Sequence, residues 1–437
     1  MNTPIYDFLL KYSSSDILRC HMPGHKGKFK CLKNICNIDI TEIKGADSLF
    51  EADGISLQSE KNMSELYNTA GSFYSAGGST LCIQAMLAAM KFENRKIIAV
   101  RNVHRAFLNA AALLDLDVIW LMPEYKCGLL SGEINIDETE NLLKKYPSSC
   151  LYVTSPDYTG KTADIKLLSE ICHKYDSVLI VDNAHGAHLH FLPESIHPIY
   201  LGADICCDSA HKMLPALTGA AVLHTSSEKY AKVLKQYMSI FASTSPSYLI
   251  MASLDLCNKY ISENIREDIK NNLAFIKDFK NKRDIKFAGG EPFHITLKAS
   301  ESGYNGNKIA EYMRINGVEC EYSDNDIVIF LMSPLNEIED YEKLSDCLNK
   351  SLTSVEKQEI ISPEFSMCLP KKALSIRQAV FSESEEIPVE NSLGRICASV
   401  KVPCPPAVPI VASGEIIDES CINIFKKYGI SSVIVVK

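Results

Sequence analysis

Short apolar runs alternate with amphipathic stretches between about residues 75 and 225. The apolar runs are rich in β-branched residues and read KIIAV, DVIWL, CLYVT and SVLIVD. The stretches between them, among them VHRAFLNAAALL and the segments near 137–146 and 164–175, carry apolar residues at helical spacing. Strands that alternate with helices of this length form crossover units and a parallel sheet covered on both faces. The pattern therefore predicts an α/β fold with a mostly parallel sheet.

Changes in this pattern divide the chain into four parts. Residues 1–60 are rich in Gly, Lys and Asp and predict an arm of loops, and the alternating pattern predicts a large domain over 61–245. A long helical stretch over 248–279, two apolar runs and two further helices predict a small α/β domain over 246–355. Residues 356–437 hold the proline-rich VPCPPAVP, a short helix and the strand SSVIVVK, and predict a C-terminal domain.

Composition and charge restrict the class of function. Of the 437 residues, 46% are hydrophobic and 23% are charged, which is typical of a globular protein. The formal net charge of -9 argues against nucleic acid as a partner and suits a small, positively charged substrate. No apolar stretch is long enough to span a membrane, and the first residues lack the basic flank of a signal peptide, so we expect no membrane association. The 16 cysteines are scattered without a CxxC pair, which predicts reduced thiols in a cytoplasmic protein.

Three stretches carry candidate chemistry. AGGST places Gly78, Ser79 and Thr80 ahead of a helix, where N–H groups and hydroxyls can hold a phosphate; a turn with an N-cap has the same letters. SVLIVDNAHGAH places Asp182 at the end of a strand, where a carboxylate either faces a ligand or closes a turn. DSAHKMLPALTG places Lys212 ahead of an apolar run, where the side chain either snorkels to water or supplies a reactive amine.

Histidines after Asp182 raise the question of a metal. His185, His188, His190 and His197 lie close together in the sequence, in chain that reads as irregular. No carboxylate accompanies them at ligand spacing, and the cysteines are not spaced as zinc ligands either. The sequence therefore predicts no metal site.

A lysine, a strand-end aspartate and a phosphate cup form the set that one cofactor requires. Pyridoxal phosphate binds a lysine through its aldehyde, a carboxylate through its ring nitrogen and several donors through its phosphate. Each stretch alone has an ordinary structural explanation, whereas the three together predict pyridoxal phosphate as the cofactor.

The chain resembles the bacterial ornithine/lysine/arginine decarboxylases, most closely the short forms without a receiver-like N-terminal domain. The resemblance covers nearly the whole chain and is carried by HMPGHKGK, SAGGST, RNVHRAFLNA, SPDYTG, VDNAHGAH, DSAHKMLPALTGA, STSPSYLIMASLD, SLGRI and PCPPAVP. It implies the fold of aspartate aminotransferase, fold type I of the pyridoxal-phosphate enzymes, with smaller C-terminal α/β domains. It also implies decarboxylation of arginine, lysine or ornithine, feeding polyamine synthesis.

The resemblance assigns roles residue by residue. Lys212 binds the cofactor covalently, Asp182 holds the ring nitrogen, and His211 or Lys212 returns a proton to the substrate. His104 stacks on one face of the ring and Ala184 packs on the other. Ser243 and Thr244 reach the phosphate of the neighbouring subunit's cofactor, which implies a homodimer or a higher homo-oligomer with its active sites at the interface. The remaining cofactor contacts fall to Gly78, Ser79, Thr80, His185 and Ser209.

Departures from the family pattern concern the substrate pocket. The chain has Asn183 where the family often has Glu, Ala210 where it has Ser or Thr, and Cys404 to Ala407 where it has Tyr-Pro-Pro-Gly. Asp47, Glu51 and Asp53 are candidates for holding a basic side chain, or are solvated loop charges.

Two other functions stay open. One is a different reaction with the same cofactor, such as transamination, for which Arg314 or Arg377 would hold a carboxylate. The other is a non-catalytic relative that binds a partner.

Overall fold

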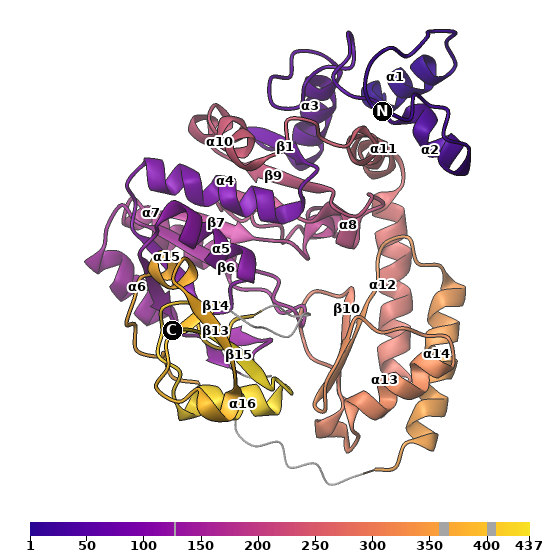
Figure 1. Cartoon of the computed structure of the whole chain (residues 1–437). Helices are drawn as coiled ribbons and strands as arrows, with labels where there is room; N and C mark the ends of the chain where they lie inside the picture. The colour runs from indigo at the N-terminus through magenta and orange to yellow at the C-terminus, as the bar shows by residue number, and fades with distance from the viewer. Residues whose placement is uncertain (126–127, 358–366, 400–407) are drawn as a thin grey trace. The chain divides into compact units, whose positions relative to one another are not determined.

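The computed structural model describes residues 1–125, 128–357, 367–399 and 408–437, and its two compact units are each described by themselves (Figure 1). The first unit comprises Met1–Glu93 and Leu179–Ile269, and the second comprises Asn94–Val178 and Lys270–Lys437. Each unit is therefore built from two separate stretches of chain. The division into 1–60, 61–245, 246–355 and 356–437 stays a prediction.

In the first unit four strands lie side by side in the order β1-β9-β8-β7. β7 and β8 are parallel, whereas β9 is antiparallel to both β8 and β1. The strands are β1 (Gly71–Ser75), β7 (Val178–Asp182), β8 (Ile205–Asp208) and β9 (Ala221–Thr225), and the helices are α1 (Pro4–Ser13), α2 (Lys33–Ile38), α3 (Ile55–Tyr67), α4 (Gly78–Phe92), α8 (Ala210–Met213), α9 (Glu228–Ala231), α10 (Leu234–Phe241) and α11 (Tyr248–Glu263).

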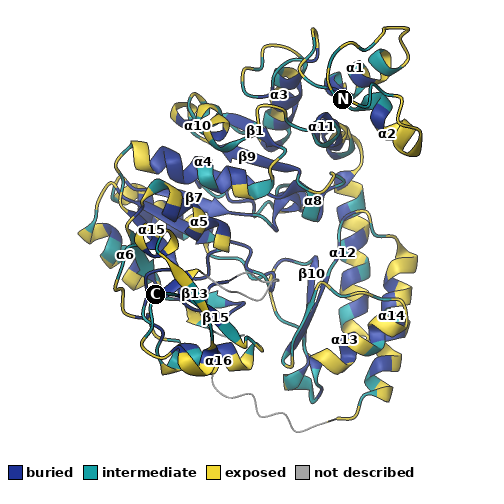
Figure 2. Cartoon of the chain, in the orientation of Figure 1, coloured by how far each residue is buried: buried dark blue, intermediate teal, exposed yellow. Residues whose placement is uncertain are grey.

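Every residue of β7, β8 and β9 is buried, and these strands are dark blue in Figure 2 where they are visible. Strands buried on both faces read as continuous apolar runs, which explains VLIVD and the apolar start of ICCD. The polar residue that ends each run, Asp182 or Asp208, is therefore a buried carboxylate.

In the second unit three parallel strands lie in the order β6-β2-β3, and two three-stranded antiparallel sheets have the orders β10-β12-β11 and β13-β15-β14. The strands are β2 (Ile97–Val100), β3 (Val118–Leu121), β4 (Glu124–Tyr125), β5 (Gly132–Glu133), β6 (Cys150–Thr154), β10 (His294–Lys298), β11 (Tyr322–Ser323), β12 (Ile327–Leu331), β13 (Ser384–Pro388), β14 (Cys397–Ser399) and β15 (Ser432–Val436). The helices are α5 (Arg105–Leu114), α6 (Ile136–Lys145), α7 (Ile165–Lys174), α13 (Gly306–Ile315), α14 (Ile338–Ser354), α15 (Ile376–Val380) and α16 (Glu419–Lys427), and α12 (Ile265–Asn281) begins in the first unit and continues into the second.

Several helices of the second unit begin at polar side chains that accept a hydrogen bond from the first turn. Asn135 accepts from the Glu138 N–H at 3.0 Å and Asp164 from the Leu167 N–H at 3.0 Å. Such caps satisfy donors that have no partner inside the helix, which fixes where α6 and α7 begin.

One expectation about secondary structure is wrong. Residues 1–60 contain α1, α2 and the start of α3 rather than loops alone, because Ile5 and Leu9 lie one helical turn apart and are both buried. The helical stretch expected over 248–279 is confirmed, and it comprises two helices, since α11 ends at Glu263 and α12 begins at Ile265.

No helix in the described part of the chain is long and apolar enough to cross a membrane. The fourteen cysteines that the structure describes are all free thiols. The segment Cys404 to Ala407, which was expected to form part of the pocket, lies outside the described residues.

Candidate active site

The turn between β1 and α4 has the features of a phosphate cup. Gly78 begins α4 with φ +68°, a conformation that favours glycine, and its N–H donates to the Gly219 oxygen at 2.8 Å. A Cβ built on Gly78 would meet no atom within 4 Å, so open space adjoins the start of the helix. N–H groups in the first turn of a helix lack intrahelical partners, and they attract an anion.

Lys212 lies in the short helix α8, directly after β8. The Lys212 N–H donates to the Ser209 oxygen at 3.0 Å, and the Ser209 hydroxyl donates to the Ser79 hydroxyl at 2.9 Å. That second bond joins the segment before Lys212 to the first turn of α4. The structure therefore brings AGGST and DSAHKMLPALTG into contact, although they lie far apart in the sequence.

His211 is held by one short contact to the backbone. Its Nδ1 lies 2.9 Å from the Ala220 oxygen, so Nδ1 carries the proton in the neutral ring and Nε2 is left as an acceptor. In this tautomer the half-buried His211 ring presents Nε2 as a hydrogen-bond acceptor.

Asp182 ends β7 as a buried carboxylate that is 2% exposed. Its Oδ1 accepts from the Ala184 N–H at 3.2 Å and from the Cys207 thiol at 3.7 Å. The Ala184 bond is the turn closure that the sequence left as an alternative. Burial of this carboxylate among strands is also what a partner for a protonated ring nitrogen requires.

His104 and the pair Ser243 and Thr244 are described by other contacts. His104 belongs to the second unit, where its Nδ1 accepts from the Ala106 N–H at 3.1 Å and caps α5. Ser243 and Thr244 are exposed in the loop after α10, and the Ser243 hydroxyl accepts from the Ser245 N–H at 3.2 Å. Their assigned roles stay predictions.

Asn183 reaches a carboxylate that sequence reasoning missed. Its Nδ2 donates to Asp208 Oδ1 at 2.6 Å, and its N–H donates to the Cys207 oxygen at 3.0 Å. Asp208 Oδ2 faces His197 and His224. Burial alone would raise the pKa of Asp208, but the two histidines outweigh it and hold that pKa well below its usual range. Only the lone aspartate before Ser209 could have signalled this network in the sequence.

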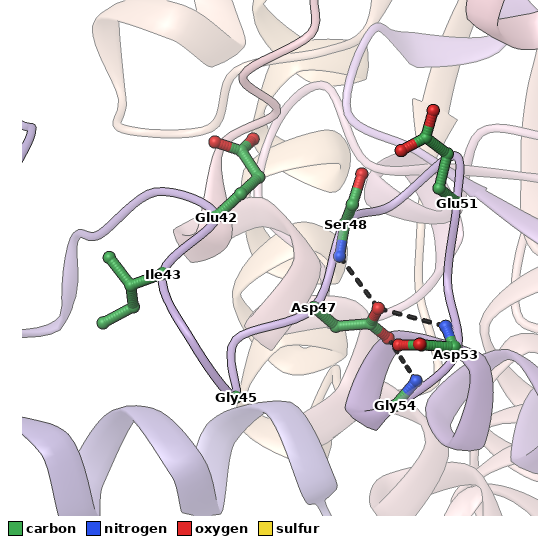
Figure 3. Close-up of a pocket in the computed structure, with 8 residues that line it drawn as sticks. All are labelled: Glu42, Ile43, Gly45, Asp47, Ser48, Glu51, Asp53 and Gly54. Atoms are coloured by element: carbon green, nitrogen blue, oxygen red, sulfur yellow. Dashed lines mark hydrogen bonds between the residues drawn. The ribbon is translucent and has the colours of Figure 1, made fainter.

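The acidic N-terminal loop forms a pocket lined by Glu42, Glu51 and Asp53, among others (Figure 3). Asp47 accepts hydrogen bonds from four backbone N–H groups, those of Ser48, Asp53, Gly54 and Ser56, at 2.8 to 3.1 Å. Burial opposes ionisation, yet these bonds lower the pKa of Asp47 below 3.8. Asp47 therefore organises the loop and the start of α3, and only the other carboxylates remain candidates for a substrate.

Comparison with known proteins places the chain in a family. A family model for the Orn/Lys/Arg decarboxylase major domain matches residues 3–296, and one for the C-terminal domain of the same family matches residues 356–428. The chain belongs to the Orn/Lys/Arg decarboxylase family. Its fold is that of fold type I enzymes.

Individual relatives agree with this assignment. The arginine decarboxylase of Bacillus subtilis is 28% identical over 97% of this chain and 93% of its own length. The constitutive lysine decarboxylase of Escherichia coli is 24% identical over 58% of this chain and 38% of its own length.

Solved structures share the fold. A lysine decarboxylase of Francisella novicida aligns with TM-score 0.82 and 17% identity, over 99% of this chain and 79% of its own. A structure of SPT with PLP aligns with TM-score 0.56 and 9% identity, over 68% of this chain and 76% of its own. The expected α/β fold with a mostly parallel sheet is thereby confirmed.

Proposed function

We propose that this protein decarboxylates arginine with pyridoxal phosphate as its cofactor. The observation that carries the proposal is the contact between Ser209 and Ser79, which joins the lysine-bearing segment to the start of α4. Arginine is favoured among the basic amino acids because the relatives that match over nearly the whole chain include several arginine decarboxylases.

The residues of the first unit fit the cofactor. Gly78, Ser79 and Thr80 would hold its phosphate, Asp182 its ring nitrogen and Lys212 its aldehyde carbon. When bound, the cofactor supplies an electron-accepting ring that makes a bond to the substrate α-carbon easier to break. The chain supplies the positioning and the proton transfers.

Each side chain then has a task that its chemistry allows. The Asp182 carboxylate would accept a hydrogen bond from the protonated ring nitrogen of the bound cofactor. The Lys212 amine would hold the cofactor's aldehyde carbon and, once free of it, could carry a proton on Nζ. Either this Nζ or His211 Nε2 returns a proton to the α-carbon after carbon dioxide leaves. A low-polarity surrounding at the carboxylate favours its loss as neutral carbon dioxide.

The acidic N-terminal loop supports a positively charged substrate. Glu42, Glu51 and Asp53 line one pocket of the unit that contains Lys212, whereas Asp47 is committed to backbone N–H groups. We propose that Glu42, Glu51 or Asp53 attracts the guanidinium group of arginine.

Transamination receives less support. Arg314 is exposed and its Nε donates to Glu319 at 2.8 Å, and Arg377 Nη1 donates to the Ala112 and Leu113 oxygens at 3.2 and 3.0 Å. Both guanidinium groups are thus engaged within the second unit. A binding-only relative would have no physical need for the Lys212, Asp182 and Ser79 set.

We also propose a homodimer in which Ser243 and Thr244 reach the partner subunit's cofactor, and their exposure is what such a role needs. Sedimentation at assay concentration should give a dimer or larger assembly. A fully active monomer would contradict this part of the proposal.

Release of carbon dioxide tests the function directly. Carboxyl-labelled arginine, lysine and ornithine are supplied separately, with pyridoxal phosphate, to the wild type, to Lys212→Ala and to the matched surface control Lys232→Ala. We expect release from arginine by the wild type and the control, and a loss of about 1,000-fold or more in Lys212→Ala. Release from lysine or ornithine alone would show that the substrate is that amino acid and not arginine. Release by Lys212→Ala at the wild-type rate would contradict the proposal.

A further inference from the structure

Three buried side chains of the first unit, those of His197, Asp208 and His224, bring possible metal-ligand atoms close together. His197 Nε2 lies 3.1 Å from Asp208 Oδ2, and His224 Nε2 lies 3.4 Å from the same oxygen. The side chains of all three are 0 or 1% exposed, and their ligand atoms lie within 4.8 Å of one another. The histidines come from the segment after β7 and from β9, so no sequence spacing reveals the cluster.

The two distances to Asp208 Oδ2 fit a tetrahedral metal ion. Zinc bonds of about 2.0–2.1 Å to nitrogen and oxygen place neighbouring ligand atoms roughly 3.3 Å apart. Two imidazoles and a carboxylate form a donor set that zinc commonly takes.

A fourth donor lies beside the cluster. Cys206 Sγ is 3.9 Å from His197 Nε2, and Cys206 is fully buried, but its sulfur lies outside the group of atoms that are all within 4.8 Å of one another. Cys206 precedes Asp208 by two positions on β8, which places both side chains on one face of the sheet. It also lies directly opposite His224 in the antiparallel register of β8 and β9.

Outer contacts orient the proposed ligands. The Ser72 hydroxyl lies 2.8 Å from His224 Nδ1, and Asn183 Nδ2 donates to Asp208 Oδ1 at 2.6 Å. Metal-bound histidines and carboxylates usually have such partners on the side away from the ion.

Hydrogen bonding alone leaves this cluster incompletely satisfied. His224 Nε2 is buried and forms no hydrogen bond of good geometry, although it faces Asp208. The ion-pair partners that the described residues give Asp208 are histidines, with no lysine or arginine. A buried carboxylate without a permanent cation is costly, and a bound divalent ion would offset that cost.

We propose that His197, Asp208 and His224 bind a zinc ion, and that the Cys206 side chain rotates toward the ion to become the fourth ligand. The ring of Tyr67 packs against His224 and His197, at centroid distances of 4.5 and 5.3 Å, and helps to close the site. Zinc at this place is structural and ties the segment after β7 to β8 and β9. This inference does not depend on the proposed reaction.

Metal content tests the inference. The full chain without a polyhistidine tag is produced with added zinc, dialysed, and analysed for zinc per chain. We expect about one zinc ion per chain in the wild type and a loss of at least tenfold in His197→Gln and Asp208→Asn. Ser72→Ala, which removes an outer contact, should weaken zinc binding by about tenfold or more.

The matched control is His190→Gln. His190 lies beside the same Tyr67 ring, at 5.2 Å between centroids, but is outside the cluster, so this variant should keep its zinc. A folded wild type that holds no zinc after supplementation, or zinc retained by His197→Gln and Asp208→Asn, would overturn the proposal and leave a hydrogen-bond network.

X-ray absorption at the zinc edge covers the case in which the variants do not fold. The wild type should show nitrogen or oxygen neighbours at about 2.0–2.1 Å and one sulfur at about 2.3 Å. A shell of oxygens alone, as for zinc adsorbed on the surface, would contradict the assignment.

Discussion

Two buried carboxylates, one in each unit, are balanced in different ways. In the second unit Glu415 accepts two bonds from Arg101, at 3.0 and 2.6 Å, and a third from the Ala412 N–H at 2.7 Å. Arg101 is fully buried, and its guanidinium also lies over the Trp120 ring at 4.7 Å from the centroid. In the first unit Asp208 faces two histidines and an amide instead.

The partner of a buried carboxylate distinguishes a structural ion pair from a binding site. Arginine carries a permanent charge and binds a carboxylate in a fork, so the charges of Arg101 and Glu415 balance without any ligand, although the buried Arg101 Nε has no hydrogen bond among the described residues. Imidazole rings can be neutral, and they are also metal ligands. A buried carboxylate among histidines therefore points to a bound cation, whereas one beside arginine does not.

The largest loss of stability should come from breaking the ion pair of Arg101 and Glu415. Glu415→Gln leaves the buried guanidinium of Arg101 without its counter-charge and should lower the free energy of unfolding by about 3–5 kcal/mol. Denaturant unfolding measures this loss. The matched control is Asp117→Asn, which removes the exposed pair with Lys372 and should cost less than about 1 kcal/mol.

Replacing both partners sharpens that result. Arg101→Met combined with Glu415→Leu leaves no unpaired charge, so most of the lost stability should return. A double variant as unstable as Glu415→Gln would show that the packing of these side chains, and not their charge, dominates.

Zinc removal should give the next largest effect, and only in the first unit's cluster. A strong chelator should lower the stability of the wild type by about 2–3 kcal/mol, if zinc was present near 100 times its dissociation constant. Asp208→Asn should be insensitive to the chelator, and Asp117→Asn should respond as the wild type does. Equal responses of the wild type and Asp208→Asn would remove the contrast between the two carboxylates.

A third carboxylate, Asp47, should give the smallest effect because it is balanced by backbone N–H groups near the surface. Its pKa is lowered from 3.8, so its contribution is present above that value and is lost as the pH falls through the lower, folded-state pKa. Asp47→Asn tolerates the left-handed backbone at φ +70° and should cost about 1 kcal/mol at neutral pH. Unfolding measured between pH 5 and 2, about the range over which such a carboxylate titrates, should show a weaker acid dependence in the variant than in the wild type.

Much of the fold and of the site could be predicted from local patterns. Asp182 ends the apolar strand β7, Gly78 begins the helix α4, and Lys212 follows the strand β8. Each of these local settings could be predicted from the residues around it. The rule that ligands gather at the ends of parallel strands then suggested that the stretches meet.

The zinc ligands could not be predicted in this way. His197 and Asp208 are brought together by the chain's path after β7, and His224 by its antiparallel register with Cys206. Of the first four histidines that follow Asp182 in the sequence, only His197 belongs to the cluster. The helix α1 was not predicted for another reason. Most of residues 1–60 is rich in Gly, Lys and Asp, which favours loops, and α1 occupies only a short part of that segment.

The proposed function requires that Lys212 is the lysine that binds the cofactor covalently. The wild type is incubated with pyridoxal phosphate, reduced with borohydride to fix the cofactor on its lysine, digested and mapped by mass spectrometry. The cofactor should be found on the peptide that contains Lys212, and prior addition of substrate should lower the yield. Attachment to a different lysine, such as the ion-paired Lys235, or no specific attachment, would contradict the account.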